Sequence, residues 1–508
     1  MSRINTNVQS MIAQRVLGHN NLALNRSLER LSTGLRINRG KDDPAGLIAS
    51  ENLRSELRAT NAAVGNAERA DQVVNIAEGG LQEISGLLTE LQGLITASAS
   101  SAGLSSEEKA ANQLQVDSIL QTIDRIASAT SFQGSKLLNG NFDYQVSGID
   151  ASVSDYKVNS AKFNGSSQDV DVIVTQSAQQ GMLFLSFGAT SLDLNDADTG
   201  NFTIELTGSQ GSRELQFASG TSLDDMVAAI NTFTDITGLV ASAASGGTGF
   251  TVYSDKFGSD EFTSVKIVNE AGIQGTSTGL GLYNFEADDA GTVDTTVIAN
   301  FDDTAAEDGI RDYGQDVAAT INGILATANG KTININTDFL DVQMTLSTNA
   351  AQTLASIDAF TITGGGADFM LAGDVDINGK VSIGISNVAV RKLGNSDLGF
   401  LSDLASGNDF NLVDSDGVDA QAIVAEAIET VSSLRGRLGA FQKNVIGATI
   451  RNLGIAIENT AAAESVIRDA DFASETAGLT RSQILTQAST QVLQIANTQP
   501  QAALQLLG

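Results

Sequence analysis

The residue types that carry most enzyme chemistry are scarce in this chain. Its 508 residues include a single histidine, His19, and no cysteine. A multi-histidine zinc site, a catalytic triad that uses cysteine and a disulfide are therefore all impossible within one chain. A lone histidine beside Asn20 and Asn21 is more typical of a polar interface residue than of a ligand. We therefore predict that the chain is not an enzyme, with no catalytic residue and no cofactor.

Acidic clusters and a glycine run are the remaining candidates for binding chemistry. The clusters are Asp193, Asp196 and Asp198, and Asp302 with Asp303. Carboxylates suit calcium, but neither cluster has the glycine-centred, glutamate-terminated spacing of an EF-hand loop. The run Gly364–Gly366 lacks the Lys-Ser/Thr ending of a phosphate-binding P-loop. We predict a solvated acidic face, a tight turn between strands, and no metal.

Charge and composition exclude several classes of partner. The net charge is −31, and residues 150–415 hold about 36 acidic and about 10 basic side chains. Aromatic residues make up 5% of the chain, with no tryptophan, so the basic stripe and stacking platform of a nucleic-acid binder are missing. No apolar run reaches the roughly 18 residues that cross a membrane. We expect neither nucleic acid nor membrane as a partner, and an acidic coat that keeps a crowded surface solvated.

Both ends of the chain carry apolar residues at the three- and four-residue steps of packed helices. One set lies in the first and last segments: Leu24, Leu28, Leu31, Leu35, Ile484, Ala488, Val492 and Ile495. A second seam lies further in: Val74, Ala77, Leu81, Ile84, Leu88, Leu91 and Ile95, with Val424, Ala427, Val431, Leu434, Leu438, Phe441 and Val445. The stripes predict an α-helical, coiled-coil-like bundle built from both termini. An intramolecular bundle with no wider purpose is the simpler alternative.

The middle of the chain changes to short β-type runs separated by Gly, Asp and Ser. Representative runs are 170–174, 202–206, 250–253 and 265–268. Residues 222–231 begin like a capped helix. We predict β-rich, α+β outer domains over residues 150–415.

The end segments resemble a known family, the bacterial flagellins. The motifs that carry the resemblance are Ile4–Asn7, Arg30–Asn38, Lys41–Leu47 and Ala77–Ile84 at one end, and Ser465–Ala473, Glu475-Thr476, Leu479–Arg481 and Gln483–Leu485 at the other. The stretch from about 200 to 270 also resembles the short IN module of flagellins and hook-associated proteins. The resemblance covers roughly the first 140 and the last 90 residues, in matching order.

The resemblance implies a self-assembling filament subunit used in swimming, arranged in layers. Residues 1–44 and 461–508 would form the inner core and a spoke, 45–149 and 416–460 a helical second layer, and 150–415 the outward domains. The first apolar set would then be the filament-core interface, and the inner seam would hold the second layer. Alternatives are a hook–filament junction protein, or a surface-displayed adhesin or glycan-binding protein.

The resemblance also implies a location and partners. Such a chain leaves the cell through the flagellar type III export apparatus without a cleaved signal peptide, and becomes extracellular. Its partners would be further copies of itself, an export chaperone, the filament cap and the hook-junction proteins. The terminal segments contain many Asn residues that weaken a helix, so we expect them to be disordered in the monomer and to fold on assembly.

Two short sites follow from the motifs. The spoke residues Arg36, Lys41, Asp42 and Asp43 would form ion pairs between subunits. Many flagellins carry a basic residue where this chain has Glu90, and Arg-Glu where it has Gln92-Gly93. That patch is what the vertebrate innate receptor for flagellin grips, so we expect weak receptor recognition.

Overall fold

The computed structural model describes residues 6–99, 104–163, 165–194, 200–244, 247–273, 280–286, 289–396, 398–413 and 417–505. The chain forms two compact units, each assembled from segments that are far apart in the sequence. The first unit takes Met1–Val74, Phe369–Val381 and Gly439–Gly508. The second takes Asn75–Asp368 and Ser382–Leu438. No helix among the described residues is long and apolar enough to cross a membrane.

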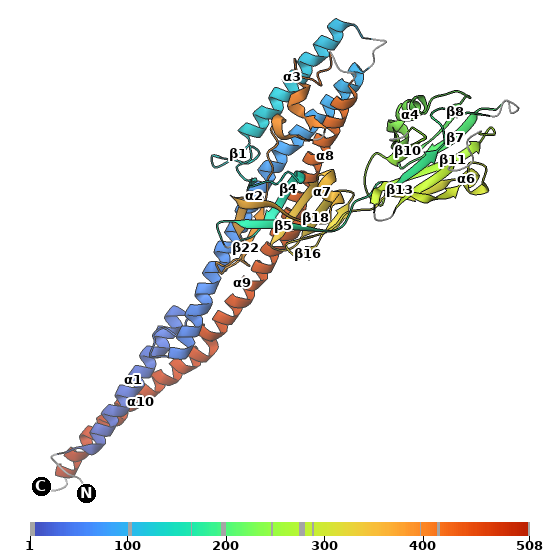
Figure 1. The fold of residues 1–508 in the computed structure, drawn as a ribbon. Coiled ribbons are helices and arrows are strands. Elements are labelled where there is room, and N and C mark those ends of the chain that lie inside the picture. The colour runs from blue at the N-terminus through green and yellow to red at the C-terminus, as the bar shows by residue number, and fades with distance from the viewer. Residues whose placement is uncertain are drawn as a thin grey trace. The chain divides into compact units, whose positions relative to one another are not determined.

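The terminal helices of the first unit pack along each other, as the sequence predicts (Figure 1). They are α1 (Val8–Thr33) and α10 (Phe472–Gln505). The side chain of Asn7 caps the start of α1 by accepting a hydrogen bond from the backbone N–H of Ser10. The helix ends at Gly34, whose φ of 73° is the left-handed conformation that glycine adopts without strain.

Three further helical segments belong to the first unit or begin in it. They are α2 (Pro44–Ser98), whose later part lies in the second unit, the π-helical turn η3 (Phe441–Ile446), and α9 (Gly447–Arg468). Helix α9 contains no fully buried residue, so none of its side chains belongs to a closed core.

The second unit has a helical part formed by the end of α2, α3 (Ser106–Ala129) and α8 (Val418–Ala440). A capping box starts α3, in which Ser105 and Glu108 satisfy each other's backbone N–H groups. The buried side chains follow one stripe per helix: Leu81, Ile84, Leu88, Leu91 and Ile95; Val116, Leu120 and Ile123; and Ile423, Val424, Ala427, Val431, Leu434 and Leu438. An ion pair of 2.9 Å between Arg435 and Glu78 joins α8 to α2.

Two β modules make up most of the rest of the second unit. The first pairs the sheets β16-β15-β5-β20-β3 and β17-β18-β19-β4. Its elements are β3 (Tyr144–Ser147), β4 (Val153–Ala161), β5 (Gln168–Gln176), β15 (Ala318–Ile321), β16 (Ile324–Leu325), β17 (Thr327–Asn329), β18 (Thr332–Asn336), β19 (Leu340–Leu346), α7 (Thr348–Gln352) and β20 (Ser356–Gly365). Alternate valines of β5 face its core, which is the period-two pattern expected of a half-buried strand.

The second module, the inserted module, lies in the chain between β5 and β15. Its sheets are β13-β12-β6-β10-β9 and β14-β11-β7-β8. Its elements are β6 (Met182–Ser186), β7 (Phe202–Thr207), β8 (Ser212–Phe217), α4 (Leu223–Asn231), α5 (Thr234–Thr237), β9 (Leu239–Ala243), β10 (Gly249–Ser254), β11 (Phe262–Asn269), β12 (Gly281–Glu286), β13 (Asp289–Ala299), α6 (Thr304–Asp308) and β14 (Ile310–Tyr313). Its core contains stacked and edge-on rings of Phe187, Phe202, Phe250 and Phe301.

The remaining elements are short. They are β1 (Ser131–Phe132), β2 (Ser135–Lys136), β21 (Ala367–Met370), β22 (Lys380–Ile383), η1 (Val390–Lys392), β23 (Gly394–Asn395), β24 (Gly399–Phe400) and η2 (Leu401–Leu404). The predicted strands are confirmed as parts of β5, β7, β10 and β11, and the predicted helix as α4 with Ser222 as its cap. The run Gly364–Gly366 does not form the predicted tight turn, because Gly364 and Gly365 belong to β20 and pair with β3, and Gly366 alone separates β20 from β21.

Candidate assembly interface

Polar side chains hold α1 against α10. Asn7 donates to the carbonyl of Ala496 at 2.7 Å, and the hydroxyl of Ser10 bonds the side chain of Asn497 at 2.7 Å. Further along, Asn20 donates to the hydroxyl of Ser489 at 2.7 Å. The net contribution of each such hydrogen bond to stability is only about 1 kcal/mol. These bonds therefore fix the register of the two helices but stabilise the pair only weakly.

Sequence reasoning interpreted Asn7 and Asn20 only as residues that weaken a helix. In the structure both carry the contact between the two helices. A sequence signal that could have identified them is the presence of small and amide side chains on one face of α1, where Ser10 and Ala13 are buried.

The apolar residues of these helices largely face solvent instead. Of the predicted filament-core set, Leu28 is 45% exposed, Ile484 59%, Val492 55% and Ile495 63%. Ala488 is also exposed, whereas Leu24, Leu31 and Leu35 are half-buried. Leu35 lies beyond the end of α1, because the helix stops at Gly34. Contacts within one chain therefore do not bury the whole stripe that the sequence spacing predicted.

The exposure is not limited to the predicted positions. Other large apolar side chains of the same two helices are exposed as well: Val8, Met11, Ile12, Val16, Leu22 and Leu485. Together with the exposed members of the predicted set, they leave apolar side chains open on both helices. Several large apolar side chains left exposed along a pair of packed helices suit an interaction site.

A short backbone clip follows α1 at the predicted spoke. Leu35 pairs with Asp469 in an isolated β-bridge, the N–H of Arg36 donates to the carbonyl of Arg468 at 2.7 Å, and the N–H of Ala470 donates to Gly34 at 2.9 Å. The guanidinium of Arg36 also reaches the carbonyl of Ile467. The clip ties the chain leaving α1 to the chain entering α10.

The other spoke residues start α2. Asp43 accepts a hydrogen bond from the N–H of Gly46 at 2.9 Å, the geometry of an N-terminal cap. Asp42 accepts from the N–H of Arg39, and Lys41 is exposed. None of Lys41, Asp42 and Asp43 forms an ion pair with another described residue of the chain.

Ion pairs surround the clip. Arg30 meets Glu475 at 2.9 Å, and Arg468 meets Glu51 at 3.1 Å. The hydrogen bond from Arg54, aided by Arg468, lowers the pKa of the Glu51 carboxyl. Glu51 is solvent-exposed, so this pairing orients side chains more than it stabilises the fold.

The inner seam is buried except at position 445. Val74, Leu81, Ile84, Leu88, Leu91 and Ile95 on α2, and Val431, Leu434 and Leu438 on α8, are almost inaccessible, with Phe441 at the start of η3 slightly more open. Position 445 differs from the stripe, because the π-helical turn places Ile446 rather than Val445 in the core.

The residues at the predicted receptor patch lie on α2, on the side away from the seam. Glu90 and Gly93 are exposed, and Gln92 and Leu94 are half-buried. A Cβ added at Gly93 would meet open space.

The described residues do not bring the candidate metal-binding side chains together. Among the described residues no group of three or more His, Asp or Glu side chains could hold a metal ion. Asp193 is exposed, Asp196 and Asp198 lie outside the described residues, and Asp303 accepts a hydrogen bond from the N–H of Asn300. His19 is exposed on α1.

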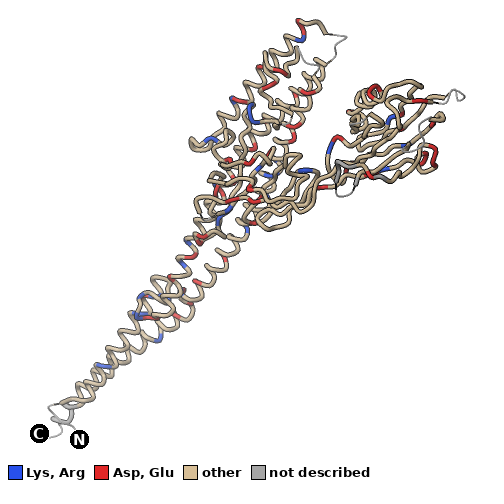
Figure 2. The backbone as a smooth tube through the Cα atoms, in the orientation of Figure 1, with Lys and Arg blue, Asp and Glu red and all other residues tan. Residues whose placement is uncertain are grey.

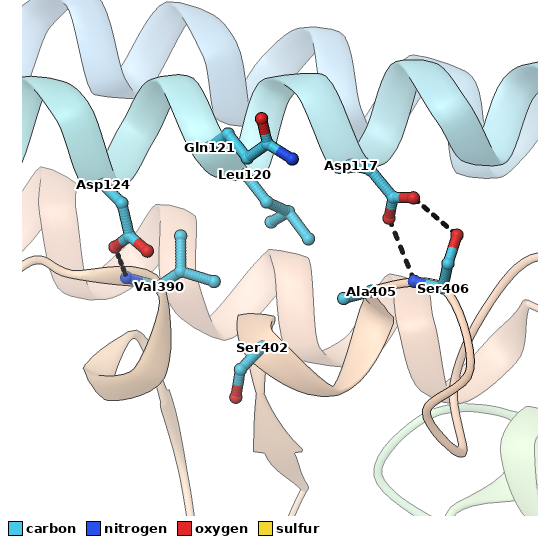
Figure 3. A pocket seen from close by; sticks show the side chains of 8 residues that line it. All are labelled: Asp117, Leu120, Gln121, Asp124, Val390, Ser402, Ala405 and Ser406. Atoms are coloured by element: carbon cyan, nitrogen blue, oxygen red, sulfur yellow. Dashed lines mark hydrogen bonds between the residues drawn. The ribbon is translucent and has the colours of Figure 1, made fainter.

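A shallow cavity of about 390 Å³ lies between α3 and the segment around η1 and η2 (Figure 3). Asp117 accepts hydrogen bonds there from the backbone and hydroxyl of Ser406, and Asp124 accepts one from the N–H of Val390 at 2.8 Å. Both carboxylates are already engaged with the chain itself (Figure 3). These hydrogen bonds connect the segment to α3, and they leave neither carboxylate of the cavity free.

Comparison with known proteins identifies the class of protein that these helices define. Residues 4–143 match the N-terminal helical region of bacterial flagellin, 421–507 match the C-terminal helical region, and 201–256 match the flagellin hook IN motif. The IN match falls on β7, β8, α4, α5, β9 and β10 of the inserted module.

Relatives align over the full length. The flagellin of Salmonella typhimurium is 30% identical over 534 residues, and flagellin D of Vibrio anguillarum is 28% identical over 505, each alignment covering 99% of both chains. A solved structure of the flagellar cap protein D2-D3 domains from Serratia marcescens is 20% identical and covers 40% of this chain and 96% of that one, at a TM-score of 0.24. The chain belongs to the bacterial flagellins, the structural and non-enzymatic subunits of the flagellar filament, which lies outside the cell and serves motility.

Proposed function

We propose that the exposed apolar side chains of α1 and α10 form the contacts between subunits at the core of the filament. The observation that supports this most directly is that polar and apolar side chains have different positions on these two helices. Polar groups such as Asn20 and Ser489 hold the pair together, while Leu28, Val492 and Ile495 remain open. Members of this family polymerise, so a neighbouring copy is the natural partner for those surfaces.

The layers of the filament follow from the same reasoning. We assign residues 1–44 and 461–508 to the inner core and spoke, and 45–149 and 416–460 to a helical second layer closed by the inner seam. Residues 150–415 are assigned to the outward domains, where acidic side chains far outnumber basic ones (Figure 2). Repulsion between acidic coats disfavours lateral association of finished filaments.

Substitution of single exposed residues tests the core interface. Leu28→Asp and Val492→Asp change exposed positions, so the monomer should keep its fold to within about 0.5 kcal/mol. In the filament each would bury a charge in place of roughly 2 kcal/mol of apolar contact, and the critical concentration for seeded polymerisation should rise at least ~10-fold. Sedimentation of filaments measures it, with circular dichroism of the monomer alongside.

Val268→Asp is the matched control, because Val268 is similarly exposed at 48% but lies on β11 of the inserted module. It should polymerise like the unaltered chain. If Leu28→Asp and Val492→Asp polymerise as readily as this control, the apolar faces of α1 and α10 are not the core contacts.

Membership of the family supports a proposal about export and accessory partners. We propose that the chain leaves the cell through the type III export apparatus with an export chaperone, without a cleaved signal peptide, and adds to the filament beneath the cap and above the hook-junction proteins. An intact mass for the filament subunit that matches the full 52.6 kDa chain is expected. A mass that lacks an N-terminal segment would contradict this route.

Weak recognition by the vertebrate innate receptor is also proposed. Glu90 places a carboxylate on the exposed face of α2 where an arginine would supply directed donors. The triple substitution Glu90→Arg, Gln92→Arg and Gly93→Glu should raise the response of a receptor reporter cell at least ~10-fold. A side chain at position 93 has room, because a Cβ there meets open space. Strong stimulation by the unaltered chain would refute the proposal.

A further inference from the structure

The loop that ends the β21–β22 hairpin displays an apolar tip. Val375 is 88% exposed, and Ile377 two residues later is 40% exposed. The carboxylates of Asp374 and Asp376 flank Val375 and are exposed too. The tip thus combines an apolar knob with negative charge, within a unit that is otherwise helical.

Hydrogen bonds close the loop. Asp376 accepts a hydrogen bond from the N–H of Gly379 at 2.7 Å, and the N–H of Leu371 donates to the carbonyl of Gly379 at 2.9 Å. A Cβ at Gly379 would lie 2.7 Å from that of Ala372, so the turn closes tightly. An exposed apolar side chain on a fixed turn binds with little loss of conformational entropy.

The base of the loop is anchored to helices of the same unit. The side chain of Asn66 on α2 donates to the carbonyl of Met370 at 3.2 Å, and the rings of Phe369 and Phe441 lie 6.3 Å apart. Val375 therefore projects from a supported platform and is not the end of a loose segment.

A complementary surface lies on α9. This 22-residue helix has no buried residue, and its large apolar side chain Ile455 is 60% exposed. Arg451 is exposed four residues earlier, so the two side chains share one face of the helix. Neither Arg451 nor Asp374 has an ion-pair partner among the residues that the structure describes.

We propose that the loop tip Asp374–Ile377 of one copy docks on the Arg451–Ile455 face of α9 in a second copy. Val375 packs against Ile455, and the acidic flank of the tip pairs with Arg451. Within one chain both apolar side chains remain largely exposed, so the contact is between copies. The two surfaces differ, so the contact is heterologous and propagates along a polymer without closing on itself. The inference rests on the proposed self-assembly and adds a second contact outside the terminal helices.

The absence of cysteine from the chain permits a direct test. Full-length Val375→Cys and Ile455→Cys proteins are copolymerised and mildly oxidised, because a disulfide forms only where the Cβ atoms approach to about 4 Å. Each protein has one cysteine, so no link can form within a chain. Val466→Cys replaces Ile455→Cys as the control, since Val466 is 81% exposed near the other end of α9.

On a non-reducing gel we expect at least ~10-fold more disulfide-linked dimer from the Val375→Cys and Ile455→Cys copolymer than from the Val375→Cys and Val466→Cys copolymer, or from filaments of any one variant alone. Intact filaments with no such excess would overturn the docking and leave self-assembly standing. Failure of the unaltered chain to polymerise would instead refute the proposed function on which the inference rests.

If the cysteine variants do not polymerise, a charge exchange decides. Asp374→Lys and Arg451→Glu should each raise the critical concentration about 3-fold or more, and the double variant should recover most of it. Additive effects of the two substitutions would overturn the proposal.

Discussion

At the scale of single residues, Asp43 of the spoke has an observed role in the fold and a proposed role in the filament. Asp43 caps α2 through the N–H of Gly46, and it has no cation partner among the described residues of its own chain. The ion pairs proposed between subunits therefore depend on the negative charge of Asp43. The cap depends instead on a side-chain oxygen atom that accepts a hydrogen bond.

Two substitutions separate these roles. Asp43→Ala removes the cap acceptor and should lower the stability of the monomer by about 1 kcal/mol, while Asp43→Asn keeps an acceptor and should change it little. Both remove the charge, so both should weaken the filament if the spoke forms ion pairs between subunits. Thermal unfolding of the monomer and cold or dilution-induced depolymerisation measure the two effects. A filament of Asp43→Asn with unaltered stability and handedness would contradict the ion-pair proposal.

Residue types alone could predict what the chain does not do. One histidine and no cysteine exclude whole classes of chemistry on composition alone. The partners of Asn7 and Asn20 could not be predicted, because the residues they reach, such as Ser489, are more than four hundred positions away. An asparagine that weakens an isolated helix and one that fixes a helix pair look the same in sequence.

At the scale of elements, periodicity located the buried seam of α2 and α8 but not its change of phase. The stripe runs through Leu438 and Phe441 and then reaches Ile446, a step of five. The π-helical turn η3 supplies that step, and it is stabilised by contacts such as the hydrogen bond from Gln442 to Asp71 at 2.8 Å. Regular spacing predicted Val445 instead, because a π turn depends on such tertiary contacts and not on local propensity.

Helix α3 offers an element-scale prediction through Asp117. Burial opposes the charge of this carboxyl, but hydrogen bonds from the hydroxyl and N–H of Ser406 and from Gln113 outweigh it and lower the pKa of Asp117 below its usual 3.8. A depressed pKa contributes stability that is present above pH 3.8 and is lost as the pH falls through the folded-state pKa.

Asp117→Asn should therefore be less stable than the unaltered chain at pH 7 by about 1 kcal/mol, after allowance for solvent screening. The difference should shrink as the pH falls below 3.8, where the unaltered carboxyl also loses its charge. Urea unfolding of the monomer from pH 7 to 3 measures it. Glu458→Gln, at an exposed position on α9, controls for the loss of one negative charge. A difference that stays constant with pH would contradict the linkage.

At the scale of the whole molecule, the two ends of the chain meet and the middle is built separately. The change from helical stripes to Gly/Asp/Ser-punctuated strands made this organisation predictable. The insertion of one β module between β5 and β15 was not, because strand pairings such as Ala319 with Val174 join positions that no local pattern relates. Paired terminal helices with polar contacts between them and exposed apolar residues support the proposal that the subunit completes its core by addition to others.

Amide hydrogen exchange of the monomer and of the filament tests that claim most directly. The account predicts that α1 and α10 exchange close to the unprotected rate in the monomer, while the buried end of α2 around Leu88 is protected. On polymerisation the amides near Leu28 and Val492 should slow by at least ~10³-fold, equivalent to ~4 kcal/mol. Terminal helices already protected in the monomer as strongly as the end of α2, with no further slowing in the filament, would contradict it.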